Sequence, residues 1–243
     1  MDAFESVLRR SLENAGVEVV EEDPADLVIA VGGDGTMLAA AATALEADVP
    51  VLGFNLGTIG FLTAAEPADV DVVTQRLAAG DFGIEERMTV AATVGDQTIL
   101  GVNDVVVEKV DSQRLIELSV AIDGVDFSTY RADGLIVATP TGSTAYSFSA
   151  GGPLVAPTLR ALVLTPVAAH SLFSRSMVIP SEQEIVVTVR RDRPVKVSVD
   201  KANLGQIREG DQVQIRRGER PARFVTLNPP SFAGLVKNKF DLP

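Results

Sequence analysis

The chain of 243 residues contains no cysteine and no tryptophan, and His170 is its only histidine. Without cysteine there is no disulfide, no thiolate metal site and no cysteine nucleophile, and a single histidine argues against a zinc site. No apolar run approaches the roughly 20 residues of a membrane-spanning helix. The acidic start, Met1 to Glu5, also lacks the basic region of a secretory signal. These absences predict a cytoplasmic protein.

Basic residues are scarce as well, and lysine above all. The chain carries 33 acidic and 21 basic residues, which gives a formal net charge of −12. This balance opposes nonspecific attraction to nucleic acid or to an anionic membrane. One hypothesis is adaptation to a cytosol of high salt, where acidic, lysine-poor surfaces stay hydrated. The alternative is an ordinary acidic protein.

Three common site motifs are also missing. The chain has neither the P-loop phosphate motif nor the Gly-x-Gly-x-x-Gly dinucleotide fingerprint. It also lacks the Gly-x-Ser-x-Gly elbow of a serine hydrolase, which argues against a Ser-His-Asp triad built on His170. A nucleotide bound by this chain must therefore be held in another way.

The first eighty residues alternate between helix and strand patterns. Helical spacing of apolar residues begins at Phe4 and ends at Gly16, and further helices are expected over 36–45 and 70–77. Strands are expected over 17–20, 26–31 and 49–53. Such alternation predicts an α/β domain, with a parallel sheet and helices on its faces.

The pattern changes after about Arg87. Short β-branched runs separated by Gly, Asp and Asn are typical of antiparallel strands, and they cover 90–94, 98–107, 115–122, 135–138, 185–189, 195–199 and 213–215. We therefore expect an α/β domain over 1–85 and an all-β domain over 86–225. The final segment, 226–243, is expected to pack back on the first domain.

The segment Gly32-Gly33-Asp34-Gly35-Thr36 lies between an expected strand and an expected helix. Backbone N–H groups and the helix dipole favour an anion at such a junction, and glycine lets phosphate oxygens approach the main chain. Thr36 suits the N-cap of the helix. A carboxylate at Asp34 would repel phosphate unless it accepts a proton or works through Mg²⁺. The alternative is a tight turn in which Asp34 caps the helix.

Two further segments carry polar or glycine-rich patterns. Gly53 to Leu62 contains three more glycines after the next strand, and loops after parallel strands can face one crevice. Asn103-Asp104 interrupts an apolar run and suits an adenine edge and a ribose diol. Neighbouring strand residues point to opposite faces, so both side chains reach one ligand only at a bulge or a strand end. The alternatives are unrelated turns and an exposed edge pair.

Residues 134–153 form the most informative stretch. An apolar run ends at Thr139-Pro140, and a turn rich in small residues and hydroxyls follows as far as Gly151-Gly152-Pro153. A core strand does not require so many Ser and Thr residues, whereas a pocket that hydrogen-bonds a ribose does. Arg131 and Asp133, just before this stretch, also fit a surface ion pair.

Taken in order, these segments resemble the ATP-dependent NAD kinases (inorganic polyphosphate/ATP-NAD kinases). The matching motifs are Gly-Gly-Asp-Gly-Thr at 32–36, the glycine segment at 53–62, Asn-Asp at 103–104 and the run at 133–147. His170-Ser171-Leu172 with Arg175 is similar to a further family segment. The resemblance spans roughly 24–243, and its 133–147 motif is highly specific to this family.

The resemblance implies an active site between the two domains and a homodimer or homotetramer that completes the NAD pocket. It implies ATP or polyphosphate as the phosphoryl donor, together with Mg²⁺ or another divalent cation. It implies no fixed metal site on the protein. It implies that Asp34 is the base for the 2′-hydroxyl of the adenosine ribose of NAD. Gly32, Gly33, Gly35 and Thr36 would face the donor phosphates, with Gly35 also near NAD. The remaining NAD-binding residues implied are Phe61, Asn103, Asp104, Arg131, Asp133, Thr141, Thr144, Ala145, Tyr146, Ser147, Phe148, Ser149 and the main chain of Ala168.

The sequence departs from the family pattern at several positions. Asp104 stands where Glu is commoner, Ala169 replaces a Pro, and Ala202 stands where a Gln often contacts NAD. Family members usually have a strand before the first helix, and this sequence starts with the helix pattern at Asp2. Two alternatives to an NAD kinase therefore stay open: a non-catalytic or weakly active NAD-binding paralogue, and a lipid or sphingoid-base kinase that shares only the first glycine motif.

Overall fold

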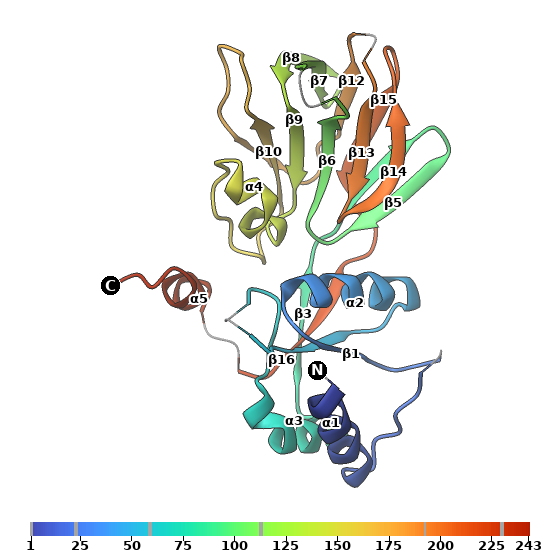
Figure 1. Cartoon of the computed structure of the whole chain (residues 1–243), viewed down its shortest axis with the longest axis vertical. Helices are drawn as coiled ribbons and strands as arrows, with labels where there is room; N and C mark the ends of the chain where they lie inside the picture. Colours follow the sequence, from blue (N-terminus) through green and yellow to red (C-terminus); the bar gives the residue numbers. More distant parts are fainter. Residues whose placement is uncertain (1, 22–23, 58–59, 112–113, 192, 229–230) are drawn as a thin grey trace. The chain divides into compact units, whose positions relative to one another are not determined.

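The computed structural model describes residues 2–21, 24–57, 60–111, 114–191, 193–228 and 231–243. The chain folds into two compact units: unit 1 is Met1–Arg87 with Ala222–Pro243, and unit 2 is Met88–Pro221. The prediction of an α/β domain followed by an all-β domain is confirmed, because unit 1 mixes helices and strands whereas unit 2 is built almost entirely of strands (Figure 1).

Unit 1 has one four-stranded sheet with the order β1-β2-β16-β3. The first three strands run parallel, and β3 pairs antiparallel with β16. The strands are β1 (Val28–Val31), β2 (Val51–Phe54), β3 (Gly83–Arg87) and β16 (Ala222–Thr226). The helical elements are α1 (Asp2–Asn14), α2 (Asp34–Ala47), η1 (Pro67–Asp69), α3 (Val70–Ala78) and α5 (Phe232–Lys239).

Apolar spacing explains the helices of unit 1. Leu8 and Leu12 of α1 are one helical turn apart and both buried, and they pack with Leu52 and Phe54 of the sheet. The ring of Phe4 meets Phe54 edge-on, with 5.5 Å between ring centroids. Helices α1 and α3 lie side by side (Figure 1). These contacts form the core beneath the sheet.

The expected strand over 17–20 is wrong. Residues 17–20 form no regular element, because the N–H of Val17 donates to the carbonyl of Leu12 and closes the end of α1 (2.9 Å). Gly16 supplies the left-handed turn there, with φ +82°. Val17 and Val19 still pack against the core, so their apolar pattern reflects burial without a strand partner.

Unit 2 contains two six-stranded sheets with the orders β11-β10-β9-β6-β13-β14 and β5-β4-β15-β12-β7-β8. Every strand pair in these sheets is antiparallel. The core cluster includes buried residues from both sheets, among them Leu118, Leu135 and Ile185. The strands are β4 (Val90–Val94), β5 (Gln97–Gly101), β6 (Asp104–Lys109), β7 (Ile116–Ile122), β8 (Val125–Ala132), β9 (Gly134–Ala138), β10 (Ala161–Val167), β11 (Met177–Pro180), β12 (Ile185–Val189), β13 (Val195–Val199), β14 (Ala202–Ile207) and β15 (Gln212–Arg217).

The apolar run at 98–107 is two strands and not one. Its first part belongs to β5, which pairs with β4, and its second part to β6, which pairs with β9 and β13 in the other sheet. The chain therefore crosses between sheets at Val102-Asn103. A crossing strand must break its ladder at such a corner, which explains why Asn103 interrupts the run.

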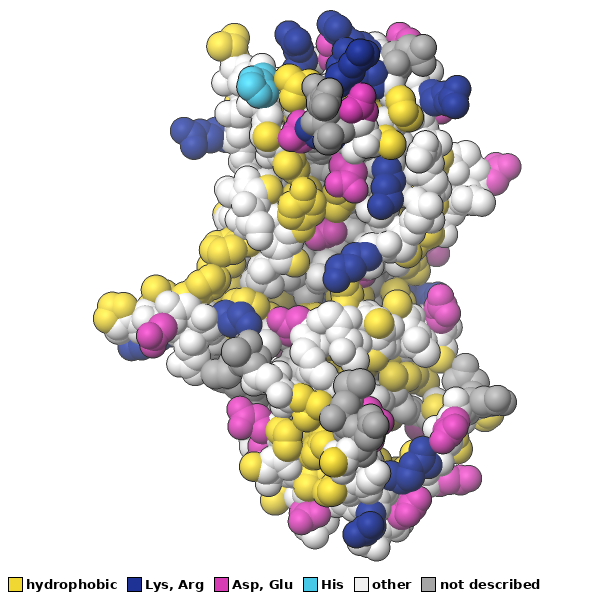
Figure 2. All heavy atoms as spheres, viewed as in Figure 1, with side chains coloured by type: hydrophobic (Ala, Val, Ile, Leu, Met, Phe, Trp, Pro, Cys, Tyr) yellow, Lys and Arg dark blue, Asp and Glu magenta, His cyan; other side chains and the backbone are white. Residues whose placement is uncertain are grey.

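The surface carries charges of both signs. In Figure 2, Lys and Arg side chains gather mainly at the end of unit 2 drawn at the top, and Asp and Glu side chains are spread over both units. Among the residues that the structure describes, no helix is both long enough and apolar enough to cross a membrane.

Candidate functional site

The glycine segment at 32–36 joins β1 to α2. Helix α2 begins at Asp34 with Gly33 as its N-cap, and no side chain caps it. Thr36 lies in the first turn, so its expected N-cap role is wrong, because the helix starts two residues before it. Nor does Asp34 cap the helix. A Cβ on Gly32 would come within 2.5 Å of the Thr36 Oγ1 atom, which explains glycine at that position.

The structure brings the two glycine segments of unit 1 together at Asp34. One Asp34 oxygen accepts a hydrogen bond from the N–H of Phe61 and the other from the N–H of Leu62, each at 3.2 Å. A Cβ on Gly60 would lie 2.3 Å from Asp34 Oδ1, so this carboxylate position requires glycine there. Residues 58 and 59 of the second glycine segment lie outside the described residues. Asp34 itself is half-buried.

Phe61 is held close to Asp34 by its backbone and is half-buried. Its carbonyl accepts a hydrogen bond from Arg87 Nη1 at 3.4 Å. Its ring lies 6.4 Å from the ring of Phe240, and the ammonium of Lys239 lies 6.0 Å from its centroid. The C-terminal helix region of unit 1 therefore flanks this predicted NAD contact.

In unit 2, Asn103 and Asp104 sit where the chain enters β6. Asn103 precedes the strand and Asp104 is its first residue, so the strand end that both side chains need is present. The Asn103 Oδ1 atom is buried and has no hydrogen-bond partner within the described chain. Such an orphaned acceptor is costly unless a ligand or water satisfies it. Asn103 is thus a strong candidate for a ligand contact.

Asp104 is nearly inaccessible, with 7% of its surface exposed. The pKa of Asp104 is raised from its ordinary 3.8 to about 7, mainly by burial and also by the negative charge of Asp200, while the positive charge of Lys201 opposes the shift. Burial also raises the pKa of Asp200. A carboxylic acid with a pKa near neutrality is typical of a functional site.

The hydroxyls of the 139–149 turn have divided roles. The Thr139, Ser143 and Ser147 side chains bond within the fold: Thr139 to the Val102 carbonyl (2.6 Å), Ser143 to the Pro140 carbonyl (2.6 Å) and Ser147 to Thr165 Oγ1 (2.9 Å). Three of the hydroxyls that suggested a ribose pocket therefore brace the turn. Thr141 Oγ1 is different, because it is buried and has no partner among the described residues.

The rest of this turn is η2 (Gly142–Thr144) and α4 (Tyr146–Ser149). Thr144 Oγ1 donates to the Thr141 carbonyl at 3.1 Å, and Ala145 is half-buried. Tyr146, Phe148 and Ser149 are exposed. The pKa of Tyr146 is raised by burial and then by the negative charges of Glu108, Asp133 and Asp104. These three carboxylates of unit 2 therefore lie close enough to Tyr146 to interact with it electrostatically.

Arg131 and Asp133 do not pair with each other. Asp133 Oδ1 accepts from Lys109 Nζ at 2.5 Å, whereas the Arg131 side chain is exposed and its backbone bonds to Ser171 and His170. Lys109 is thus a charged partner that the sequence reasoning missed, because 24 residues separate it from Asp133. Ala168 is exposed and has a left-handed backbone, with φ +46°.

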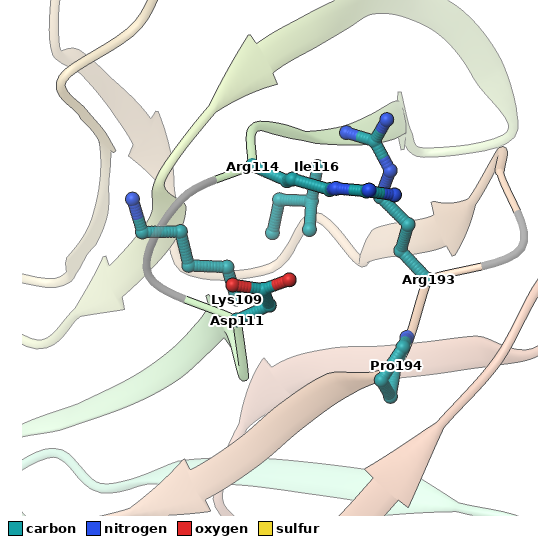
Figure 3. Close-up of a pocket in the computed structure, with 6 residues that line it drawn as sticks. All are labelled: Lys109, Asp111, Arg114, Ile116, Arg193 and Pro194. Carbon is teal, nitrogen blue, oxygen red and sulfur yellow. The ribbon is translucent and has the colours of Figure 1, made fainter.

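A separate small cavity of about 150 Å³ in unit 2 involves one of these residues. Figure 3 shows Lys109 and Asp111 on one side of it and Arg193 and Pro194 on the other. Arg114 and Ile116 complete the lining. The six lining residues include none of the predicted site residues, but Lys109 pairs with one of them, Asp133.

Comparison with known proteins gives the family of this chain. The ATP-NAD kinase N-terminal domain model matches residues 7–82, and the ATP-NAD kinase C-terminal domain model matches residues 102–227. A curated NAD kinase from Moorella thermoacetica is 44% identical over 229 residues, which cover 92% of this chain and 74% of that protein. NAD kinase 2 from Streptomyces avermitilis is 41% identical over 239 residues, 93% of this chain and 79% of that protein. The chain belongs to the NAD kinase family.

Among the solved structures that are similar to this chain, two match most of its length. An NAD kinase from Archaeoglobus fulgidus in complex with ATP has a TM-score of 0.85 and 28% identity, and the match covers 100% of this chain and 97% of that one. Yeast NADH kinase complexed with NADH has a TM-score of 0.83 and 28% identity, covering 90% of this chain and 67% of that one. The resemblance seen in the motifs is therefore confirmed, and the protein is an enzyme, a kinase.

Proposed function

We propose that this enzyme transfers a phosphoryl group from ATP or polyphosphate to the 2′-hydroxyl of the adenosine ribose of NAD, which produces NADP. The observation that carries the proposal is the Asp34 carboxylate at the start of α2, held by the N–H groups of Phe61 and Leu62. The solved relatives support the substrates, since one is in complex with ATP and another with NADH.

The donor phosphates are assigned to Gly32, Gly33, Gly35 and Thr36. The first intrahelical bond of α2 joins the N–H of Met37 to the Gly33 carbonyl at 3.0 Å. The N–H groups from Gly33 to Thr36 therefore precede the helical ladder and can donate to an anion, whereas the N–H of Gly32 donates to the Phe54 carbonyl at 2.9 Å. A Cβ on Gly33 or Gly35 would meet nothing within 4 Å, so open space remains beside this backbone.

Asp34 is assigned the general base. A ribose hydroxyl is a weak nucleophile at neutral pH, and a carboxylate within hydrogen-bond reach accepts its proton as the new P–O bond forms. The P–O bond between the transferred phosphoryl group and the donor breaks in the same step, and ADP or the shortened polyphosphate leaves. Each Asp34 oxygen accepts one backbone N–H and keeps further lone-pair capacity. The two N–H donors fix the direction of the carboxylate, which is the positioning that phosphoryl transfer requires.

NAD is assigned to a larger set of residues. Asn103 and Thr141 each offer a buried oxygen without a partner in the described chain, and Asp104 offers a carboxylate for the ribose diol or an adenine edge. Arg131 and Asp133 are assigned to the other end of the dinucleotide, and Ala168 contributes its main chain. The other assigned residues are Gly35, Phe61, Thr144, Ala145, Tyr146, Ser147, Phe148 and Ser149. A homodimer or homotetramer would complete the pocket.

A divalent cation fits this site only together with the donor. Among the residues that the structure describes, no group of three or more His, Cys, Asp or Glu side chains converges on one point. Asp34 offers a single carboxylate, and Mg²⁺ is usually held by one or two carboxylates plus substrate phosphates. Bound in that way, the cation would neutralise charge on the donor phosphates and offset repulsion from Asp34.

The test is NADP formation by the purified enzyme given NAD, MgCl₂ and either ATP or polyphosphate. An NADP-specific dehydrogenase detects the product, so a phosphate on another hydroxyl gives no signal. Asp34→Asn removes the proton acceptor and keeps the shape, and we expect activity to fall at least about 100-fold. Glu46→Gln is the matched control, because Glu46 is an exposed carboxylate in the same helix.

Full activity in Asp34→Asn would refute the assignment of the base. Tight binding of NAD in calorimetry with no turnover of the wild-type enzyme by either donor would instead favour a weakly active NAD-binding member of the family. Comparison of ATP with polyphosphate in the same assay identifies the donor.

A further inference from the structure

Asp200 connects a hairpin turn to the Asn103-Asp104 segment. It lies at the turn between β13 and β14, in a left-handed conformation with φ +48°. Its Oδ1 atom accepts from the N–H groups of Asn103 (2.8 Å) and Asp104 (3.0 Å), and its Oδ2 atom accepts from that of Val102 (2.5 Å). Its own N–H donates to the Asp104 carbonyl at 3.1 Å. One residue thus makes four hydrogen bonds to three consecutive residues.

The same segment is held from its other side by Thr139. The N–H of Thr139 donates to the Asn103 carbonyl at 2.8 Å, and its Oγ1 atom donates to the Val102 carbonyl at 2.6 Å. Gly142 allows this approach, since a Cβ there would lie 2.1 Å from the Asn103 oxygen. The backbone of Asn103 is therefore fully engaged, while its side-chain Oδ1 is left without a partner in the described chain.

These hydrogen bonds satisfy N–H groups that the crossing between the two sheets would otherwise leave without partners. Where the chain crosses between two sheets, successive N–H groups leave one ladder before they join the next, and buried donors must find partners elsewhere. A carboxylate has two oxygens and several lone pairs, and its charge strengthens each bond. Gly101 leaves room for it, because a Cβ at Gly101 would lie 3.2 Å from Asp200 Oδ1.

We infer that Asp200 is a positioning residue for the adenosine of NAD, acting by fixing the backbone of Val102 to Asp104 so that Asn103 and Asp104 present their side chains to the nucleoside. The inference rests on the proposed function, and it adds a residue that contacts no substrate itself. Its carboxylate sets the direction of two neighbouring side chains, so NAD binding depends on it and donor binding does not.

Asp200→Asn separates this role from the turn conformation. Asparagine tolerates a left-handed backbone, so the hairpin turn is kept. The amide nitrogen of asparagine, however, takes the place of one acceptor oxygen. It cannot accept a hydrogen bond from the backbone N–H groups that it faces. Asp123→Asn is the matched control: Asp123 lies in the β7–β8 hairpin turn with φ +50° and is exposed.

We expect Asp200→Asn to raise the KM and the calorimetric Kd for NAD about tenfold or more at pH 8, with the KM for ATP unchanged within about twofold. Asp123→Asn should change neither constant. A purely structural role would instead lower the active fraction, and so kcat, with both KM values unchanged. That outcome, or an unchanged Kd for NAD, would overturn the inference.

The pH profile gives a second readout. The charge of Asp200 raises the pKa of Asp104, Lys201 lowers it, and Tyr146 is the other titratable group coupled to Asp104. Loss of the Asp200 charge should therefore move the acid limb of the NAD affinity to lower pH, and an unmoved limb counts against the inference. If Asp200→Asn does not fold, Thr139→Val is the second variant. It removes the side-chain bond to the Val102 carbonyl, together with the bond that Thr139 Oγ1 accepts from the N–H of Gly142 (3.0 Å), and must weaken NAD binding in the same selective way. Absence of NADP formation by the wild-type enzyme would refute the proposed function alone, because the calorimetric comparison still tests Asp200.

Discussion

Asp104→Asn should make the folded protein more stable above neutral pH while it weakens NAD binding. The pKa of Asp104 rises from 3.8 to about 7 on folding, mainly because the carboxyl group is buried. A rise of that size means that the ionised group destabilises the folded state by about 4 kcal/mol. Asparagine has nearly the same shape and no charge, so the substitution removes this electrostatic penalty.

The sign and the pH window follow from the two pKa values. The folded state binds the Asp104 proton more tightly than the unfolded state does. The free energy of unfolding of the wild type, compared with that of Asp104→Asn, is therefore greatest below about pH 4. This contribution is lost as the pH rises through about 7. The amide N–H groups of asparagine also need partners, and an unmet buried donor costs about 1–3 kcal/mol. That cost does not change with pH. The net gain at pH 8 should therefore be roughly 1–3 kcal/mol, and the pH slope should keep its full size.

Urea unfolding of both proteins at several pH values between about 4 and 8 measures the difference in free energy of unfolding. The advantage of Asp104→Asn should grow by about 3–4 kcal/mol across this range. Asp96→Asn, an exposed residue in the β4–β5 turn, is the control and should show no such growth. An advantage that stays constant with pH would refute the reasoning, since the buried charge would then carry no penalty.

Three further predictions concern activity and salt. Because protonation removes the charge of Asp104 and part of its capacity to accept hydrogen bonds from NAD, the KM for NAD should rise as the pH falls below about 7, and a flat KM between about pH 6 and 8 would contradict this. Gly60→Ala should lower kcat about 100-fold by displacing the Asp34 carboxylate, whereas Gly57→Ala, whose Cβ meets nothing within 4 Å, should leave kcat unchanged; equal effects would contradict the placement of Asp34. If the net charge of −12 reflects adaptation to high salt, the melting temperature should rise steeply between low and multimolar KCl, and equal stability at both would disprove the adaptation.

Local sequence patterns predicted the elements whose residues are apolar at a regular spacing. The β12 and β13 strands have the predicted bounds, since alternating Val and Ile residues mark a half-buried strand. The pattern gave no signal for β8 (Val125–Ala132), which is largely exposed and polar. It also gave none for β3 (Gly83–Arg87), which among the described residues pairs with β16 alone. Such strands form because a partner is present, and the partner lies far away in the chain.

In the candidate site too, residues with a local signal were predicted, and residues that depend on distant partners were not. The glycine segments and the Asn103-Asp104 pair were visible because glycine and paired polar residues stand out in apolar surroundings. Asp200 was not assigned a role, because its three backbone partners lie 96 to 98 residues earlier. The internal hydrogen bonds of Thr139, Ser143 and Ser147 could not be predicted either. A Ser or Thr whose hydroxyl stabilises a turn cannot be told in the sequence from one whose hydroxyl binds a ribose.

The strand order of unit 1 has a consequence for how the protein is made. β16 comes from residues 222–226, yet it lies between β2 and β3, and within the described part of the chain β3 pairs with no other strand. Unit 2 is a continuous segment that can complete its sheets as it leaves the ribosome. Unit 1 cannot close its sheet until residues 222–226 have been synthesised. A ribosome that stalls before residue 222 would therefore release a chain with an unpaired β3 and an open edge on β2, a target for chaperones and proteases.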